Sequence, residues 1–287
     1  MLHGMSIDVE DYYQIVHKNY LHRQIEPSAE VERNTLFLLD TLGQAGVKAT
    51  FFVLATIAHH YPGLVKRMVA EGHEVGVHGY EHALISTMTP ETFRENIRRA
   101  QGEIEDLTGY AVTGHRAPAF SITKDSFWAI DVLRELHFVY DSSVYPIKGK
   151  RYGIPDAPKH LYRWQNGLYE VPLSCIEVCG QSLPVAGGGY LRYFPFFWTR
   201  YALRRIEQAG RPAVIYMHPY EFEQTPPSAF PYRDDLPFRL KLHNALQSIN
   251  RGNRHREKLR QLLAACKFTT LLELVRHHAH ENGESCS

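Results

Sequence analysis

The sequence predicts an α/β fold built on a largely parallel sheet. From the N-terminus onward, short runs rich in β-forming residues alternate with amphipathic segments of helix length. The chain has 287 residues, of which 44% are hydrophobic and 22% charged, so it is long enough to bury a large core. Because no repeat or Pro/Ser-rich linker divides it, residues 1–287 are expected to form a single domain.

The first half of the chain supplies five strand units and the helices between them. Strands are expected at 5–8, 47–54, 73–78, 112–115 and 138–141, and helices at 29–45, 62–71, 90–108 and 124–136. The longest helix has a suitable N-cap in Thr89, Pro90 in its first turn, and Gly109 just past its end. Residues 169–173 and 213–218 add two strands, which gives about seven in all.

The second half is expected to be less regular. Residues 145–165 and 181–195 predict long loops, which are uncommon unless they are functional. A Pro-rich segment follows Tyr220 to about Pro237, and helices are then predicted at 239–250 and 255–265, before a polar tail. Residues 238–287 are therefore expected to pack as a C-terminal helical extension on the outside of the domain.

The overall composition argues against several classes of function. The formal net charge is only +1, which offers no electrostatic footprint for nucleic acid or an anionic membrane. No apolar stretch is long enough to span a membrane, and the N-terminus lacks a basic segment followed by an apolar one, so a cytoplasmic protein is expected. Four cysteines are too few for a disulfide framework. The 17 histidines point instead to metal or acid–base sites.

Polar side chains gather where the predicted strands end. They are Asp8, Glu10 and Asp11 after the first strand, His78 and His82 after the third, Arg116 after the fourth, Asp141 after the fifth and His218 after the last. In parallel α/β folds, the loops at this edge of the sheet converge on one mouth. Their shared placement is the strongest evidence in the sequence for a functional site.

A metal centre is the first chemistry that these residues suggest. His78 and His82 are separated by four residues, and two imidazoles plus one carboxylate form an open zinc-type site. Taken alone, the pair could be two unrelated loop histidines, and the carboxylates at 8–11 could be a solvated turn. Three carboxylates at one strand end repel one another unless a cation neutralises them, so the two groups together favour a metal site.

Acid–base chemistry is the second. Arg116 beside Asp8 would orient that carboxylate and keep it ionised, although an ordinary surface arginine is the alternative. His218 ends a buried strand and is either a core histidine or an acid. Asp141 is either a turn residue or the carboxylate that orients His218. The aromatic run 190–198 follows Gly187–Gly189 and is interpreted as packing or as a border for sugar rings.

The order and spacing of these polar residues resemble those of a known family. The order of Asp8, His78-x3-His82, Arg116-Ala-Pro118 and Ile215-Tyr-Met-His218 is similar to that of the polysaccharide deacetylases, carbohydrate esterase family 4, with their NodB homology domain. The Gly187–Arg192 run and the segment from Phe268 to Leu271 resemble the exosortase-associated branch, which is found in exopolysaccharide gene clusters.

The resemblance implies a distorted (β/α)7 barrel that removes N-acetyl groups from a saccharide and uses one divalent ion. Zinc is the first candidate for this ion, and cobalt, nickel or iron also fit the ligands. It implies Asp8 as general base, steadied by Arg116, and His218 as acid with Asp141 behind it. His78 and His82 are the implied metal ligands, with Glu10 or Asp11 as the carboxylate. The backbone N–H near Ala119 is the implied oxyanion donor. Substrate contacts are expected from Ala119, Phe120, Gly188, Tyr190 and Arg192.

Two departures keep alternatives open. Val9 follows Asp8 where many relatives have a second Asp, so Glu10 and Asp11 remain equal candidates for the metal. Ala119 and Phe120 stand where relatives have an aromatic directly after the proline, which resembles an allantoinase-like branch. A cyclic-amide hydrolase and a catalytically inactive glycan-binding protein are therefore the alternatives to an N-deacetylase.

Overall fold

Seven parallel strands form the centre of the fold. The computed structural model describes residues 1–287 except 22, 150–151, 186, 226–236, 248 and 285–287. In hydrogen-bonded order the seven are β10 (Val214–Met217), β1 (Leu2–Val9), β2 (Thr50–Val53), β3 (Glu74–Val77), β4 (Gly114–His115), β5 (Tyr140–Asp141) and β7 (Tyr169–Glu170). This curled sheet confirms the α/β class and the predicted strand number for the parallel path.

Further strands lie beyond the seven. β6 (Tyr162–Arg163) pairs antiparallel with β7, and β8 (Cys175–Val178) forms a hairpin with β9 (Gln181–Pro184). The expectation of irregular structure at 145–165 and 181–195 was therefore wrong in part. These strands have two to four residues, and the period-2 pattern is hard to detect over so short a length.

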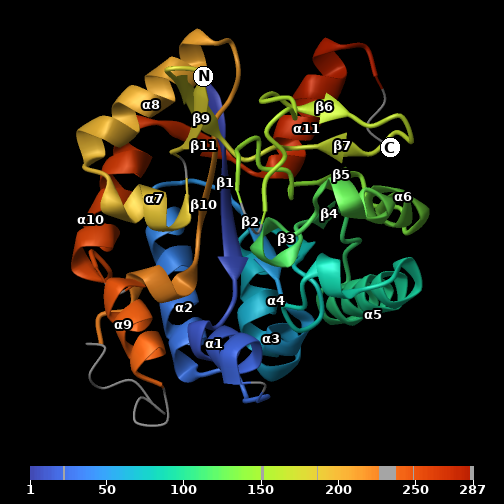
Figure 1. The fold of residues 1–287 in the computed structure, drawn as a ribbon, viewed down its shortest axis with the longest axis vertical. Coiled ribbons are helices and arrows are strands. Elements are labelled where there is room, and N and C mark those ends of the chain that lie inside the picture. The colour runs from blue at the N-terminus through green and yellow to red at the C-terminus, as the bar shows by residue number, and fades with distance from the viewer. Residues whose placement is uncertain (22, 150–151, 186, 226–236, 248, 285–287) are drawn as a thin grey trace.

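Helices surround the sheet on its outer side (Figure 1). The N-terminal half contains α1 (Tyr12–Leu21), α2 (Ala29–Gln44), α3 (Ala55–His60), α4 (Pro62–Ala70), α5 (Pro90–Thr108) and α6 (Trp128–Glu135). Thr89 caps α5 as predicted, because its hydroxyl accepts the N–H of Thr92, and Gly109 ends the helix in a left-handed conformation. The sequence did not predict α1 or α3, and residues 124–126 form a separate 3-10 turn before α6.

The C-terminal half adds α7 (Gly188–Tyr193), α8 (Phe196–Gln208), α9 (Phe238–Gln247), α10 (Asn253–Ala265) and α11 (Leu271–Glu281). The helices predicted at 239–250 and 255–265 are present as α9 and α10, but the prediction of a polar tail after them was wrong. β11 (Lys267–Thr269) joins the sheet beside Leu2–Gly4 of β1, and α11 buries Leu271 and Val275 against it. The Pro-rich segment falls largely outside the described residues.

The core lies between the sheet and its helices. Val9, Phe51, Val53 and Val77 on the strands are inaccessible to solvent, as is Leu38 of α2. All four residues of β2 are buried, as expected for a strand covered on both faces. Among the described helices, none has both the length and the apolar character needed to cross a membrane.

Candidate active site

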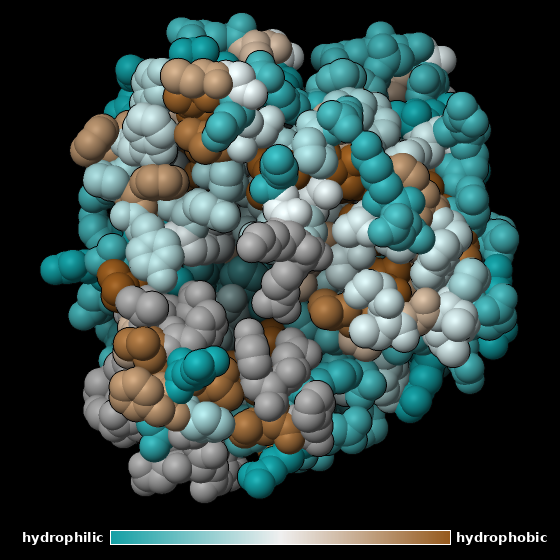
Figure 2. All heavy atoms as spheres, viewed as in Figure 1, coloured by the Kyte–Doolittle hydropathy of each residue, from teal (hydrophilic) through white to brown (hydrophobic). Residues whose placement is uncertain are grey.

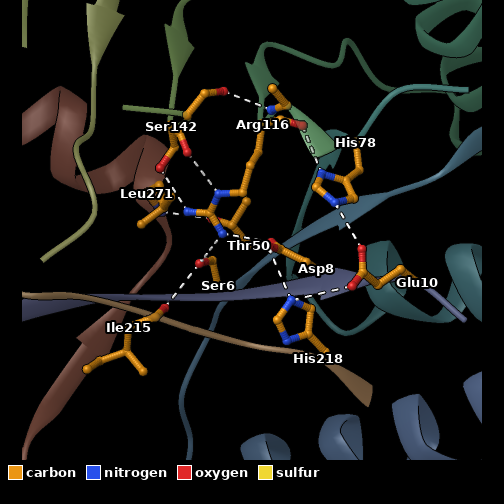
Figure 3. A network of polar contacts seen from close by, with 12 residues as sticks. Ser6, Asp8, Glu10, Thr50, His78, Arg116, Ser142, Ile215, His218 and Leu271 are labelled. Atoms are coloured by element: carbon orange, nitrogen blue, oxygen red, sulfur yellow. Dashed lines mark hydrogen bonds and ion pairs between the residues drawn. The ribbon is translucent and has the colours of Figure 1, made fainter. Parts of the chain in front are cut away.

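The predicted strand-end residues converge at one edge of the sheet. Asp8 and Glu10 come from the end of β1, His78 and His82 follow β3, Arg116 follows β4, and His218 follows β10. β1, β2 and β10 are neighbours, and β3 and β4 continue the same parallel path, so their carboxyl ends lie together. Figure 3 shows Asp8 between Arg116 and His218, and Glu10 between His78 and His218.

Glu10, His78 and His82 form a compact group of ligand atoms. One ligand atom from each lies within 4.8 Å of the others, and all three residues are buried. Oε2 of Glu10 is 2.9 Å from Nε2 of His82 and 3.3 Å from Nε2 of His78. Burial alone would raise the pKa of Glu10, but the charges of His82 and His218 and the contacts with His78 and His82 hold it well below its usual range.

The donor set fits a divalent transition metal. His78 donates its Nδ1–H to the carbonyl of Arg116 at 2.8 Å, which fixes the tautomer and leaves Nε2 as the ligand atom. Two imidazole nitrogens and one carboxylate leave coordination positions open, which is the arrangement of catalytic rather than structural zinc sites. The geometry and chemistry of these three residues therefore fit a bound divalent ion.

Asp11, the other carboxylate that the sequence left open, is directed elsewhere. Its Oδ1 accepts the N–H of Gln14 in the first turn of α1, and its Oδ2 accepts the N–H of Ser28, both at 2.9 Å. A carboxylate at the N-terminus of a helix satisfies backbone donors that the helix cannot. Glu10, whose side chain is one methylene longer, is the carboxylate that reaches the two histidines.

Asp8 is held by a fully buried arginine. Arg116 donates from Nη1 to Oδ1 of Asp8 and to Oγ of Ser6, both at 2.7 Å. Its remaining donors bond to the carbonyl (3.0 Å) and hydroxyl (2.8 Å) of Ser142, and its guanidinium lies 4.3 Å from the ring centre of Phe52. Since nearly every donor is engaged, the guanidinium is fixed in place. The expected pairing of Arg116 with Asp8 is present.

His218 faces the same space from the opposite strand. Its Nε2 lies 3.5 Å from Glu10 and 4.0 Å from Asp8. Its ring stacks on Tyr220 at 4.8 Å with an interplanar angle of 16°, and Tyr216 meets it edge-on at 5.6 Å. Burial disfavours the charged ring, but Glu10, a hydrogen bond and charge from Glu221, and Asp8 raise the pKa of His218 to about 9.

The carboxylate behind His218 is Glu221, so the prediction of Asp141 was wrong. Oε2 of Glu221 lies 3.3 Å from Nδ1 of His218 and accepts the backbone N–H of the same residue at 3.0 Å. Asp141 instead accepts from Nδ1 of His115 at 2.7 Å. Burial alone would raise the pKa of Glu221, but the nearby His218, His255 and Arg192 lower it to about 2.

Asp141 supports the site from a distance. It accepts the hydroxyl of Ser143 at 2.7 Å, and that hydroxyl accepts the N–H of Ala117 at 2.8 Å. The chain of contacts holds the loop that begins at Arg116. Glu221, Ser142 and Ser143 were not among the predicted site residues. Only Glu221 had a local signal in the sequence, because a Glu three residues after His218 has the spacing of a capping box.

The expected substrate residues do not all face the mouth. Ala119 and Phe120 adopt φ of +52° and +53°, and the Phe120 ring packs edge-on against Tyr216 at 4.9 Å. Gly188 begins α7 beside the Tyr216 hydroxyl, and Tyr190 lies near enough to Tyr145 to affect its pKa. Arg192 was wrongly expected on the substrate side, since its buried side chain lies 3.7 Å from Glu221.

Comparisons with known proteins show two matched regions in the chain. The sequence pattern of the polysaccharide deacetylases matches residues 27–139, and a domain of unknown function, DUF3473, matches 142–276. The chain therefore carries a polysaccharide deacetylase domain over residues 27–139. Peptidoglycan-N-acetylglucosamine deacetylase PgdA of Listeria monocytogenes is 40% identical over 98 residues, which cover 34% of this chain and 20% of that protein. A chitooligosaccharide deacetylase of a Bradyrhizobium species is 36% identical over 96 residues, 33% of this chain and 42% of that one.

A solved structure shows the same fold over nearly the whole chain. It is that of a Mycobacterium smegmatis protein assigned to the polysaccharide deacetylases, with a TM-score of 0.63, 18% identity, and coverage of 98% of this chain and 91% of that one. The two matched sequence regions contain part of the site, and Asp8 and Glu10 lie before both of them. His78, His82 and Arg116 fall in the deacetylase match and His218 and Glu221 in DUF3473, a pairing that is consistent with the branch that the sequence resembles.

Proposed function

We propose that the chain is a metal-dependent N-deacetylase that hydrolyses the N-acetyl group of an N-acetylated saccharide. The observation that carries this proposal is the convergence of Glu10, His78 and His82 beside both Asp8 and His218. A ligand set with open positions, next to a carboxylate and an imidazole, supplies the groups needed to add water to an amide.

An ion held by these three residues would polarise the amide carbonyl and lower the pKa of a water molecule. Asp8 accepts a proton from the attacking water, and Arg116 holds that carboxylate in position. His218 then donates the proton that the departing amine needs as the C–N bond breaks, which releases acetate and a free amine. Glu221 holds the His218 ring so that Nε2, not Nδ1, faces the site.

The substrate proposal rests on the family and on the branch. The relatives named above act on N-acetylglucosamine polymers or oligomers by their names. We propose an N-acetylated saccharide of exopolysaccharide synthesis for this chain, and zinc as the ion, with cobalt, nickel or iron as substitutes. A cytoplasmic location stays a prediction of the sequence.

The test measures acetate release from N-acetylglucosamine oligomers by the full chain, stripped with a chelator and reloaded with each of the four metals. Reloading is expected to restore activity, and Asp8→Asn to abolish it while the protein still binds one metal per chain. Asp11→Asn is the matched control, since that carboxylate lies one turn away and faces α1. Background acetate from every oligomer with full metal occupancy, together with opening of allantoin, would overturn the proposal in favour of a cyclic-amide hydrolase.

A further inference from the structure

An aromatic and basic surface on α7 and α8 has no part in the site described above. Residues 190–206 contain seven aromatic side chains and four arginines, and no Asp or Glu. This concentration contrasts with the net charge of +1 for the whole chain. A segment of that composition is expected to be core or to meet a partner, and the structure distinguishes the two.

Much of this surface is open to solvent. Phe197 is 73% exposed, Tyr201 43%, Tyr193 42% and Phe194 37%. Residues 197 and 201 are four apart in α8, so they share one face of the helix. Figure 2, in the same view as Figure 1, shows brown and pale side chains mixed over α8 at the upper left. Exposed aromatics clustered on one helix face mark an interaction site rather than a core.

The aromatic side chains are held in fixed positions. Trp198, which is half-buried against the core, lies 5.9 Å from the ring of Phe194 and 5.3 Å from that of Tyr201. On the inner side of the same helix, Ala202 and Ile206 are buried. The exposed rings are therefore presented on a rigid base, and binding through them costs little side-chain entropy.

Arginines border the aromatic side chains. Arg200, Arg204 and Arg205 are exposed, and in the described part of the chain none of the three forms an ion pair with a carboxylate. Arg205 donates to the hydroxyl of Tyr201 at 3.1 Å. We name these three arginines with Tyr193, Phe194, Phe197 and Tyr201 the aromatic–basic surface.

A cavity of about 500 Å³ opens beside it, between α7 and α10. Its lining includes Phe194, Arg254 and Lys258, and its one acidic residue, Glu257, pairs with Arg260 at 3.7 Å. The cavity gives room for an anionic headgroup next to rings that suit the border between headgroups and acyl chains.

We propose that the aromatic–basic surface docks the protein onto an anionic lipid membrane. Aromatic side chains on one helix face with arginines along it are what peripheral proteins use to lie in the headgroup region. The one acidic residue of α8, Glu207, lies 3.1 Å from His3. A second copy of the chain fits less well, because a two-fold contact would place the arginines of both copies against each other. A neutral saccharide would gain little from three arginines, and single-stranded nucleic acid prefers a groove to the outer face of a helix.

The test is co-flotation of the full chain with vesicles of phosphatidylcholine alone or with 30% phosphatidylglycerol, at about 0.1 M salt. Binding is expected only to the anionic vesicles, and it should weaken as salt rises. Arg204→Gln should lower the partition coefficient about fivefold, which corresponds to about 1 kcal/mol per arginine at an anionic surface. Phe197→Ala should lower it about tenfold or more.

Matched controls exist elsewhere on the surface. Tyr110 is 67% exposed at the far end of α5, and Arg98 is an exposed arginine of the same helix, so Tyr110→Ala and Arg98→Gln should bind as the parent does. Acetate release from soluble oligosaccharides should be unchanged in Phe197→Ala, which separates this proposal from the one on activity. The proposal would be overturned by absence of binding to anionic vesicles or by equal losses in the control variants. It would also be overturned if substitutions in the aromatic–basic surface instead abolished dimerisation, saccharide binding or oligonucleotide binding.

Discussion

Replacing Glu221 by Gln tests which carboxylate serves His218. The amide keeps the shape of the side chain and can still accept the backbone N–H of His218, but it loses the negative charge 3.3 Å from Nδ1. We expect kcat for deacetylation to fall and KM to change little, because His218 acts on the departing amine and not on bound substrate.

The magnitude follows from the surroundings of Glu221. Its ordinary pKa of 4.5 falls to about 2, and its side chain is 1% exposed. That drop of about 2.5 corresponds to about 3 kcal/mol in favour of the charged carboxylate, shared among His218, His255 and Arg192. If the whole of it acted on the protonated imidazole, the loss in kcat would reach about 10²-fold, so we expect a loss between tenfold and 10²-fold.

The matched control is Asp141→Asn, which removes an equally buried carboxylate that bonds to His115 instead. Initial rates of acetate release are measured for both variants at saturating oligosaccharide, with metal content and melting temperature recorded for each. The reasoning is refuted if Glu221→Gln keeps kcat within twofold of the parent. It is equally refuted if Asp141→Asn, folded and fully loaded with metal, loses as much as Glu221→Gln does.

Three further predictions concern the metal, packing and acid stability. Glu10→Gln should weaken zinc affinity at least 10²-fold by titration calorimetry, whereas Asp11→Asn should not; equal losses would contradict the ligand assignment. Gly187→Ala places a methyl group 1.9 Å from a tyrosine ring and should cost about 1–3 kcal/mol in urea unfolding, while Gly102→Ala, in open space on α5, should not destabilise; no loss at 187 would refute the packing. Burial lowers the pKa of His73 to about 4, so the unfolded chain binds the proton first and stability should fall between pH 6.5 and 4. His73→Asn, whose oxygen can accept the same backbone N–H, should flatten that fall, and an unchanged slope would refute it.

The sequence was most informative where structure depends on local or periodic signals. Strong β-formers at 50–53 and 214–217, and the cap and stop residues Thr89 and Gly109, fixed elements that the structure reproduces. The edge at which the site forms could also be predicted, because parallel strands place all their carboxyl ends together. His78, His82 and Arg116 follow from that rule and from the spacing of their motifs.

The predictions that were wrong share a physical cause. They concern strands, helices and side chains whose partners lie far away in the sequence, and the sequence does not show which partners come close in space. β6 is two residues long and depends on antiparallel pairing with β7, so no pattern marks it. β11 and α11 are stabilised by contacts with β1, at the other end of the chain. Arg192, which follows a glycine loop, was expected to contact the substrate, but its side chain is buried beside Glu221.

The choice between Asp141 and Glu221 shows this cause most clearly. Asp141 ends a strand of the same sheet, but its carboxylate already has a nearer donor in His115, on the adjacent strand at the paired position. Glu221 lies in the turn that starts at His218, where it accepts that residue's own N–H and so reaches the ring without any long-range fit. The entropic cost of bringing a local partner to His218 is small, because the turn fixes both residues together. A carboxylate three residues away is therefore a better candidate for orienting a strand-end histidine than one that depends on the register of a distant strand.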